Sequence, residues 1–394
     1  MIPQQENTPA RPSTPRPAYD IASWRSRIPI LRSLIPLNNC SHSPQTHDTR
    51  AAADRYLDGW NRTGMDWDGW MAEVQQARES FARLINAPPE SVAVCGSVSQ
   101  ATSSIASALR LSGERNRLVV SEAEFPTVGH VWLAQQSRGA NVAWVPVRDG
   151  VTDPDDYRSA IDERTAIVSA CHGFYQTGFV QDIPDIARIA HERGALLFVD
   201  AYQTIGTRPI DVAALDVDFL ASGCLKFLMG IPGIAFLYVR PALIASLEPT
   251  ITGWFGRRDP YAFRVKELDW SRTSSRFDMG TPPVIESYIA RAGMCIVEEI
   301  GVDAIHDWTT MLSRRLIDGG AARGLSLQGT TDPARKAPTT AFLCRRDSHA
   351  VELQLRERGI IGSARGSVIR IAPHFYNTFD DIDRALDALV EIGP

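Results

Sequence analysis

Short apolar runs alternate with segments of helical periodicity through residues 91–239. The apolar runs read SVAV, RLVVSE, VAWVPV, TAIVSAC, ALLFVD, VDFLAS and GIAFLYV, and helical patterns such as QATSSIASALRL, VGHVWLAQQS and IPDIARIAHERG lie between them. Strands that alternate with helices in this way form a mainly parallel sheet with helices on both faces. The chain is therefore predicted to be an α/β protein, and its ligand is expected beyond the carboxyl ends of the strands.

Composition changes along the chain predict four parts. Residues 1–20 are polar and rich in proline, which predicts a disordered lead-in. Residues 21–60 are expected to pack on a small domain and at the entrance of the site, and residues 61–282 to form a large domain around a seven-stranded sheet. The segments TTAFLC, HAVELQLRERG, VIRIA and DDIDRALDALVEIG then follow a β-α-β-α order, so residues 283–394 are predicted to be a smaller α+β domain.

Charge and cysteine spacing exclude several classes of partner. The net charge is -5 and basic residues form no run, which argues against nucleic-acid binding. No apolar run reaches the ~18 residues needed to span a membrane, and no secretory signal is recognised, so a cytoplasmic location is expected. The six cysteines form no CxxC pair and the eight histidines no HExxH motif. No metal site is therefore predicted.

One lysine stands out in the stretch FLASGCLKFLMGIPG. Only Lys226, Lys266 and Lys336 are present in the whole chain, and Lys226 lies among apolar and small residues. An apolar setting lowers the pKa of a lysine, and the neutral amine can then attack an aldehyde to form a Schiff base. The alternative is a lysine whose stem crosses apolar surface while its charged head reaches water.

Polar and aromatic residues at neighbouring strand ends favour the first interpretation. Asp200 ends ALLFVD, where a buried carboxylate needs a cationic partner such as a protonated pyridine nitrogen. Gln203 could bond a ring hydroxyl, Ser99 in CGSVSQATSS lies at a helix start that favours a phosphate, and Phe125 could lie on a planar ring. Singly, these could be a turn acid, a helix cap and a core aromatic; together they fit pyridoxal 5'-phosphate.

Longer motifs resemble a known family. FVDAYQTIGTRPIDVAALDVDFLASGCLKFLMGIPGIAFLYV, TGWFG, RFDMGTPP and RIAPHFYNT resemble the class V branch of fold-type I pyridoxal-phosphate enzymes. This branch includes kynureninase-like, cysteine desulfurase-like and isopenicillin N epimerase-like proteins. The resemblance runs from about residue 37 to near the C-terminus. It implies a homodimer with active sites at the subunit interface.

The resemblance also implies a role for each matching residue. Lys226 and Asp200 would be catalytic, with Lys226 holding the cofactor as a Schiff base and Asp200 bonding the pyridine nitrogen. The cofactor would further be bound by Val98, Ser99, Phe125, Gln203 and, more weakly, Ser222, with Trp254, Gly280 and Thr281 reaching the phosphate from the neighbouring subunit. Arg370 would grip the substrate α-carboxylate.

Three further candidates come from their place in the sequence alone. Tyr175 follows the strand TAIVSAC and could touch the cofactor or the substrate. Asn39 and His42 in LNNCSHSP could bind the substrate at the entrance of the site; a histidine packed in a surface loop is the alternative.

Departures from the family narrow the predicted reaction. Cysteine desulfurases carry a nucleophilic cysteine shortly before the carboxylate arginine, and the corresponding RGIIGSARGSVIR has none. Leu225 replaces the histidine that usually precedes the lysine in desulfurases. The acid that follows FPT in kynureninases is Val128 here, and their histidine after the aspartate is Gln203. These differences argue against a persulfide-forming desulfurase and against kynurenine as substrate.

The leading prediction is a lyase that acts on a small α-amino acid. It would break a bond at Cβ, by C–S elimination or Cβ–Cγ cleavage, after Lys226 has removed the Cα proton. An aminotransferase or an amino-acid epimerase uses the same residues and is the alternative. A non-catalytic protein that kept the fold is a third possibility, against which the joint presence of Lys226, Asp200 and Arg370 argues.

Overall fold

The computed structural model describes residues 16–111 and 113–394. Residues 1–15 of the predicted lead-in lie outside these residues. Within the described part, Asp20 caps the first helix, α1 (Ile21–Ser26), and its carboxylate accepts hydrogen bonds from the backbone of Ala22 and Ser23.

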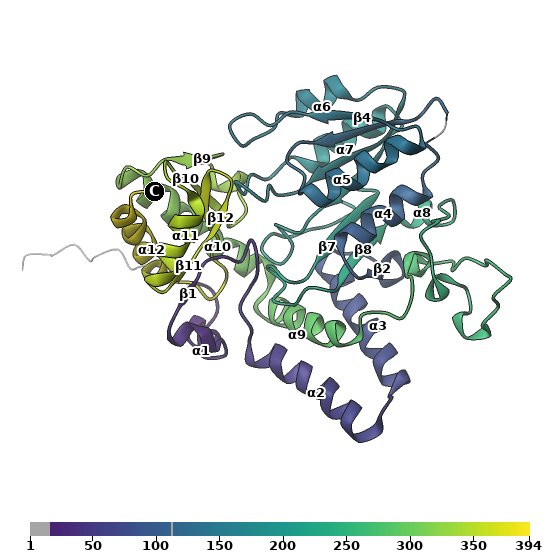
Figure 1. Ribbon diagram of the computed structural model, residues 1–394, viewed down its shortest axis with the longest axis horizontal. Coiled ribbons are helices and arrows are strands. Elements are labelled where there is room, and N and C mark those ends of the chain that lie inside the picture. Colours follow the sequence, from purple (N-terminus) through teal and green to yellow (C-terminus); the bar gives the residue numbers. More distant parts are fainter. Residues whose placement is uncertain (1–15, 112) are drawn as a thin grey trace, which may run out of the picture.

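A seven-stranded sheet forms the centre of the molecule (Figure 1). Its order is β2-β8-β7-β6-β5-β3-β4, and only β8 runs antiparallel to its neighbours. The strands are β2 (Val92–Cys95), β3 (Arg117–Ser121), β4 (Asn141–Val145), β5 (Thr165–Cys171), β6 (Leu196–Asp200), β7 (Phe219–Gly223) and β8 (Ala235–Val239). Each contains one of the apolar runs of the sequence, so the predicted mainly parallel α/β sheet is confirmed.

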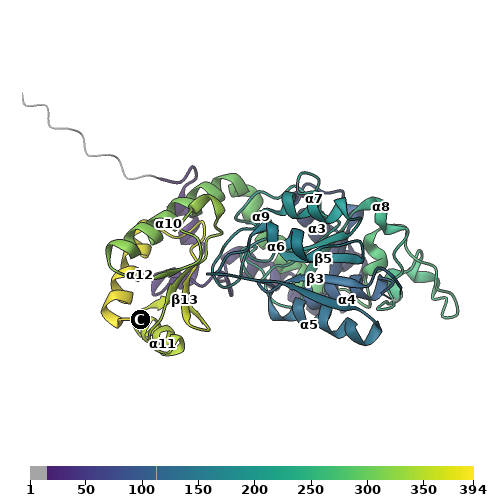
Figure 2. The ribbon, with the colours of Figure 1, turned by 90° about the horizontal axis from the view of Figure 1, so that it is seen from above.

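Helices cover both faces of this sheet because successive strand residues point to opposite sides. In β6, Leu197 and Val199 belong to one core and Phe198 to the other. The first core contains residues of α3 (Trp67–Leu84), α6 (Pro154–Ala160), α7 (Ile183–Glu192) and α9 (Val284–Ile300); the second contains residues of α4 (Val98–Ala108), α5 (Pro126–Ala134) and α8 (Pro241–Ile244). Figure 2 shows the sheet between the two helical layers.

Residues 302–394, here called the C-terminal unit, form a second layer structure (left in Figure 1). A four-stranded antiparallel sheet has the order β12-β13-β10-β9 and packs against three helices. These elements are β9 (Leu327–Gln328), β10 (Thr340–Leu343), β12 (Ser363–Arg365), β13 (Val368–Ile371), α10 (Val302–Ala322), α11 (Ser348–Glu357) and α12 (Phe379–Ile392). Thr378 and Asp381 form a capping box that begins α12.

The N-terminal segment joins both parts. Its strand β1 (Ile35–Pro36) pairs in parallel with β11 (Ile360–Ile361), and the Tyr19 hydroxyl donates to the Phe375 carbonyl at 2.7 Å. The next helix, α2 (His47–Thr63), packs instead against α9, which also packs against α3. The domain boundaries at residues 60/61 and 282/283 stay predictions.

Two expected absences concern the described residues only. None of their helices combines the length and the apolar character that crossing a membrane requires. Within residues 16–111 and 113–394, no three His, Cys, Asp or Glu side chains are grouped as metal ligands.

Candidate active site

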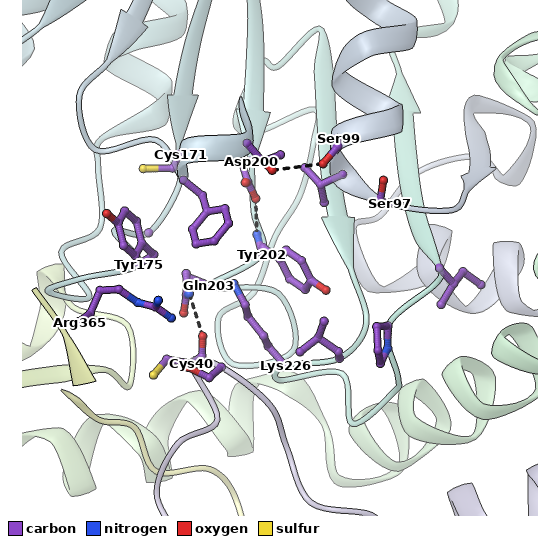
Figure 3. A pocket seen from close by; sticks show the side chains of 18 of the residues that line it. Cys40, Ser97, Ser99, Cys171, Tyr175, Asp200, Tyr202, Gln203, Lys226 and Arg365 are labelled. Atoms are coloured by element: carbon purple, nitrogen blue, oxygen red, sulfur yellow. Dashed lines mark hydrogen bonds between the residues drawn. The ribbon is translucent and has the colours of Figure 1, made fainter. Parts of the chain in front are cut away.

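A cavity of about 340 Å³ lies at the carboxyl ends of the parallel strands (Figure 3). Parallel sheets bind ligands at this edge because the strand ends and helix starts converge there. The walls come from the turn between β2 and α4, the ends of β5 and β6, the loop after β7, residues 40–41, and the β12–β13 hairpin. Residues far apart in sequence, from Cys40 to Arg370, thus face one space.

Lys226 enters this cavity from the loop after β7. Its Nζ lies 4.1 Å from the centre of the Tyr202 ring and 5.6 Å from that of Phe125. Burial lowers the pKa of Lys226 to about 8; Arg370 and Arg365 act in the same direction, whereas Asp200 opposes them. At pH 7 about a tenth of the amine is then neutral, compared with less than about a thousandth at the usual lysine pKa, and the neutral form is the nucleophile.

Asp200 occupies the last position of β6 and is buried. Its Oδ1 accepts a hydrogen bond from the Tyr202 backbone at 2.8 Å. Burial raises the pKa of Asp200, while that hydrogen bond and the charge of Lys226 lower it. No arginine, lysine or histidine of the described residues forms an ion pair with this carboxylate, so a bound cationic group would relieve its burial.

Gln203 presents an unsatisfied amide to the same space. Its Nε2 donates to the Cys40 carbonyl at 3.1 Å, whereas its buried Oε1 has no hydrogen-bond partner among the described residues. A buried amide oxygen is costly without a partner. A hydroxyl-bearing ligand would supply one.

The start of α4 forms another wall. Ser97 caps the helix by accepting a hydrogen bond from the Gln100 backbone. Val98 and Ser99 occupy the first turn, where backbone N–H groups have no acceptor within the helix. The Ser99 hydroxyl lies 3.3 Å from that of Thr127. Backbone N–H groups and two hydroxyls at a helix start suit a phosphate.

Two aromatic rings also line the cavity. Phe125 and Tyr175 meet edge to face, with ring centres 5.3 Å apart and planes at 86°. Phe125 is 39% exposed although apolar, which leaves its ring available to a planar ligand.

Arg370 approaches from β13 of the C-terminal unit and is 1% exposed. Its Nη1 donates to the Tyr175 carbonyl at 2.6 Å, and its Nη2 to the hydroxyls of Ser41 at 2.9 Å and Ser363 at 2.7 Å. These contacts fix a guanidinium at the cavity wall without a carboxylate partner among the described residues. Its charge is available to an acidic ligand.

The structure places three predicted site residues outside the cavity. Ser222 is fully buried in β7, and its hydroxyl donates to the Gly223 carbonyl. The Asn39 amide is used internally, since it donates to the Ala372 carbonyl and accepts from Ser43 and Tyr376. His42 lines a separate hollow beside Met229. Within one chain these residues do not contact the site, which corrects their predicted placement; the adjacent Cys40 and Ser41 line it instead.

Trp254 and Thr281 also lie outside the cavity of their own chain. Trp254 packs among aromatic side chains, with ring centres 6.0 Å from Trp67 and 5.9 Å from Phe263. Their predicted contact with the phosphate of a neighbouring subunit stays a prediction, as does that of Gly280.

Sequence reasoning missed one lining residue, Tyr202, and one buried acid next to the cavity, Glu124. Tyr202 lies two positions after Asp200, and a Cβ on Gly223 would come within 2.3 Å of its hydroxyl, so Gly223 provides the space for the phenol. Glu124 lies behind Asp200, accepts from the Ser169 hydroxyl at 2.7 Å, and has a pKa raised by burial and by the Asp200 charge. The only sequence signal for Glu124 was its place in SEAEFPT, directly after a predicted strand.

The described residues fit pyridoxal 5'-phosphate. The cavity offers a lysine with a lowered pKa, a buried carboxylate without an ion-pair partner, an amide oxygen without a partner, an exposed ring and an open helix start. These correspond to the aldehyde, pyridine nitrogen, ring hydroxyl, ring face and phosphate of that cofactor. Lys226, Asp200, Gln203, Phe125 and the first turn of α4 would hold it.

Comparisons with known proteins lead to the same family. Residues 57–385 match the class V aminotransferase family. A Bacillus subtilis protein named "Uncharacterized aminotransferase YcbU" is 37% identical over 371 residues, or 93% of this chain and 96% of the relative. A kynureninase of Burkholderia mallei is 25% identical over 390 residues, or 94% of this chain and 92% of the relative.

Solved structures share the fold. The apo structure of a cysteine desulfurase from Thermococcus onnurineus NA1 matches with a TM-score of 0.86, covering 96% of this chain and 99% of the other at 21% identity. This agreement confirms the predicted fold-type I architecture. The chain belongs to the class V aminotransferase family, whose members use pyridoxal phosphate.

Proposed function

We propose that this protein is a pyridoxal-phosphate lyase that removes a Cβ substituent from a small α-amino acid, by C–S elimination or by Cβ–Cγ cleavage. The observation that carries the proposal is the pairing, in one cavity, of a lysine whose pKa is about 8 with a buried carboxylate and a buried arginine. The lysine can move a proton, the carboxylate can hold a cation, and the arginine can orient a carboxylate.

Each group has a defined task in this proposal. The cofactor, when bound, withdraws electrons from the Cα of the amino acid attached to its aldehyde. Asp200 keeps a cationic nitrogen at the end of β6, and Arg370 orients the substrate α-carboxylate. Lys226 Nζ removes the Cα proton, which its neutral form can accept. Phe125 and Tyr175 exclude water from one side.

The proton acceptors of the cavity bear on the choice between elimination and epimerisation. Lys226 is the only lysine among its lining residues in the described part of the chain, and no histidine lines it. Proton transfer by Lys226 alone suits elimination or transamination, whereas epimerisation by two bases needs a second acceptor, which here would have to be one of the lining tyrosines or cysteines. An aminotransferase remains the second candidate, because a relative with 37% identity carries that name.

Lys226 gives the most direct test of the shared chemistry. Lys226→Ala is expected to lose covalent cofactor attachment, measured by borohydride reduction and mass spectrometry, and to lower turnover by at least about 1,000-fold, in line with the loss of a general base and the attachment point. Arg345→Ala, at an exposed position of the C-terminal unit that does not line the cavity, is the control and is expected to match the wild type. A wild-type protein that stays colourless with added pyridoxal phosphate would instead indicate a non-catalytic protein.

Product analysis separates a lyase from an aminotransferase. A lyase releases the Cβ substituent with continued turnover when no oxo acid is added, whereas an aminotransferase stops after one half-reaction until an oxo-acid acceptor is supplied. We expect continued release from a panel of cysteine derivatives and β-substituted amino acids. Turnover that depends on an oxo acid would replace the lyase proposal, and conversion between enantiomers would indicate an epimerase.

We further propose that the active enzyme is a homodimer, in which Trp254 and Thr281 reach the partner's cavity. Support comes from apolar side chains exposed on residues 261–268, where Phe263 is 73%, Val265 95% and Leu268 62% exposed. This segment forms the projecting loop at the right of Figure 1. Large exposed apolar groups on one surface mark interaction sites. The cytoplasmic location stays a prediction.

A further inference from the structure

A second arginine faces the cavity besides Arg370. Arg365 ends β12, next to the turn that leads into β13, and is a lining residue of the cavity. Figure 3 shows its guanidinium extending from the C-terminal unit toward Gln203 and Cys40. It is also close enough for its charge to lower the pKa of Lys226.

The two arginines differ in how their charges are engaged. Arg370 is buried and donates to four oxygen acceptors, the carbonyls of Tyr175 and Ser363 and the hydroxyls of Ser41 and Ser363. Arg365 is exposed and, among residues 16–111 and 113–394, has neither an ion pair nor a side-chain hydrogen bond. Glu352 lines an adjoining hollow with Arg365, but its carboxylate pairs with His349 at 3.2 Å. The Arg365 guanidinium is thus free to bind a ligand.

The charged residues of the cavity indicate which ligand group still has to be assigned. Its charged lining residues in the described chain are Asp200, Lys226, Arg365 and Arg370. In the proposed function, Asp200 serves the pyridine nitrogen, Lys226 the aldehyde, and Arg370 the substrate α-carboxylate. Arg365 is left as an unneutralised cation beside the substrate. A guanidinium in this position favours a second anionic group, which it can bind through two N–H donors.

We propose that Arg365 binds an anionic group on the substrate side chain, so that the preferred substrate is an α-amino acid bearing a side-chain carboxylate or sulfinate. This inference rests on the proposed function, because it assumes that Arg370 takes the α-carboxylate. Both arginines belong to one antiparallel hairpin, in which Ser363 pairs with Arg370 and Arg365 with Val368. The hairpin therefore sets the spacing between the two anionic groups that the site accepts.

Ligand binding tests this proposal without turnover. Calorimetric titration of the cofactor-loaded wild type with succinate and with propionate compares a dicarboxylate with a monocarboxylate. We expect succinate to bind about 10- to 100-fold more tightly, the range of one charge-assisted contact, and expect this preference to weaken at high salt. Arg365→Gln should abolish the preference and leave propionate binding unchanged.

Arg345→Gln is the matched control, because Arg345 is also an exposed arginine of the C-terminal unit but does not line the cavity. It should keep the wild-type preference. In turnover assays, Arg365→Gln should raise KM for aspartate or cysteine sulfinate about 10- to 100-fold relative to that for a neutral substrate. Equal binding of succinate and propionate by the wild type, or an unchanged preference in Arg365→Gln, would overturn the proposal.

Failure of the proposed function gives a different result. A wild type that attaches the cofactor through Lys226 yet converts neutral amino acids as readily as acidic ones would reject the role of Arg365 alone. A wild type that attaches no cofactor would reject the proposed function itself.

Discussion

Single residues at the strand ends decide what the cavity can bind. Tyr202 illustrates this, since its ring covers the Lys226 amine at 4.1 Å and its hydroxyl occupies the space over Gly223. The hydroxyl occupies space that a side chain at position 223 would fill, and the Leu225 backbone forms a hydrogen bond with it. A change of one carbon at position 223 therefore acts directly on the site.

We predict that Gly223→Ala weakens cofactor binding by about tenfold, since overpacking a well-filled site costs about 1–3 kcal/mol. The added methyl would lie 2.3 Å from the Tyr202 hydroxyl and 2.4 Å from its ring carbon. Fluorescence titration with pyridoxal phosphate measures the effect. Tyr202→Ala should suppress it in the double variant, because the clash is removed; additive effects of the two substitutions would contradict this explanation.

Elements of the sheet were easier to predict than the cavity walls. The runs TAIVSAC and ALLFVD became β5 and β6 because a buried parallel strand is apolar on both faces. Asp200 and Lys226 were found because polar residues that directly follow such strands meet at one edge. Ser222 was misplaced because its strand is buried on both faces, so a polar residue near the strand end can still point away from the ligand.

The N-terminal loop shows that local sequence does not determine which side chains face the cavity. Asn39 and His42 were expected at the site, and their neighbours Cys40 and Ser41 line it. The Asn39 side chain is directed by residues more than 300 positions away, since it donates to the Ala372 carbonyl and accepts from the Tyr376 hydroxyl. Tyr202 gave no specific signal for the same reason, since only the folded chain brings it to Lys226.

Helix α7 contains a histidine that should make the stability of the fold depend on pH. His191, in its last turn, lies 3.0 Å from Asp216 and 2.9 Å from Asp218, and the hydrogen bond with Asp218 is the main cause that raises its pKa. A raised pKa means that the folded state binds the proton more tightly than the unfolded state. The resulting stabilisation is complete below about pH 6.5 and is lost as the pH rises through the folded-state pKa.

His191→Gln should therefore reduce stability more at about pH 5.5 than at about pH 8.5. Urea unfolding of both proteins across this range measures the difference. A difference that does not change with pH would show that the ion pairs of His191 contribute nothing to stability.

At the scale of the whole molecule, the exposed loop of residues 261–268 predicts association. We expect a dimer in sedimentation velocity, and we expect Phe263→Asp combined with Val265→Asp to shift it toward monomer, because charges in an apolar interface are costly. Leu353→Asp is the control, since Leu353 is 48% exposed on α11, a helix remote from this loop in sequence and in Figure 1. A monomeric wild type would contradict the proposed shared sites.

The cavity is built from residues that span most of the chain, from Cys40 in the N-terminal loop to Arg370 in β13. No shorter stretch of the polypeptide contains all its walls. During synthesis, the cofactor pocket can therefore be completed only after nearly the entire polypeptide has left the ribosome. Acquisition of colour by a newly made molecule would then report that its two ends have come together.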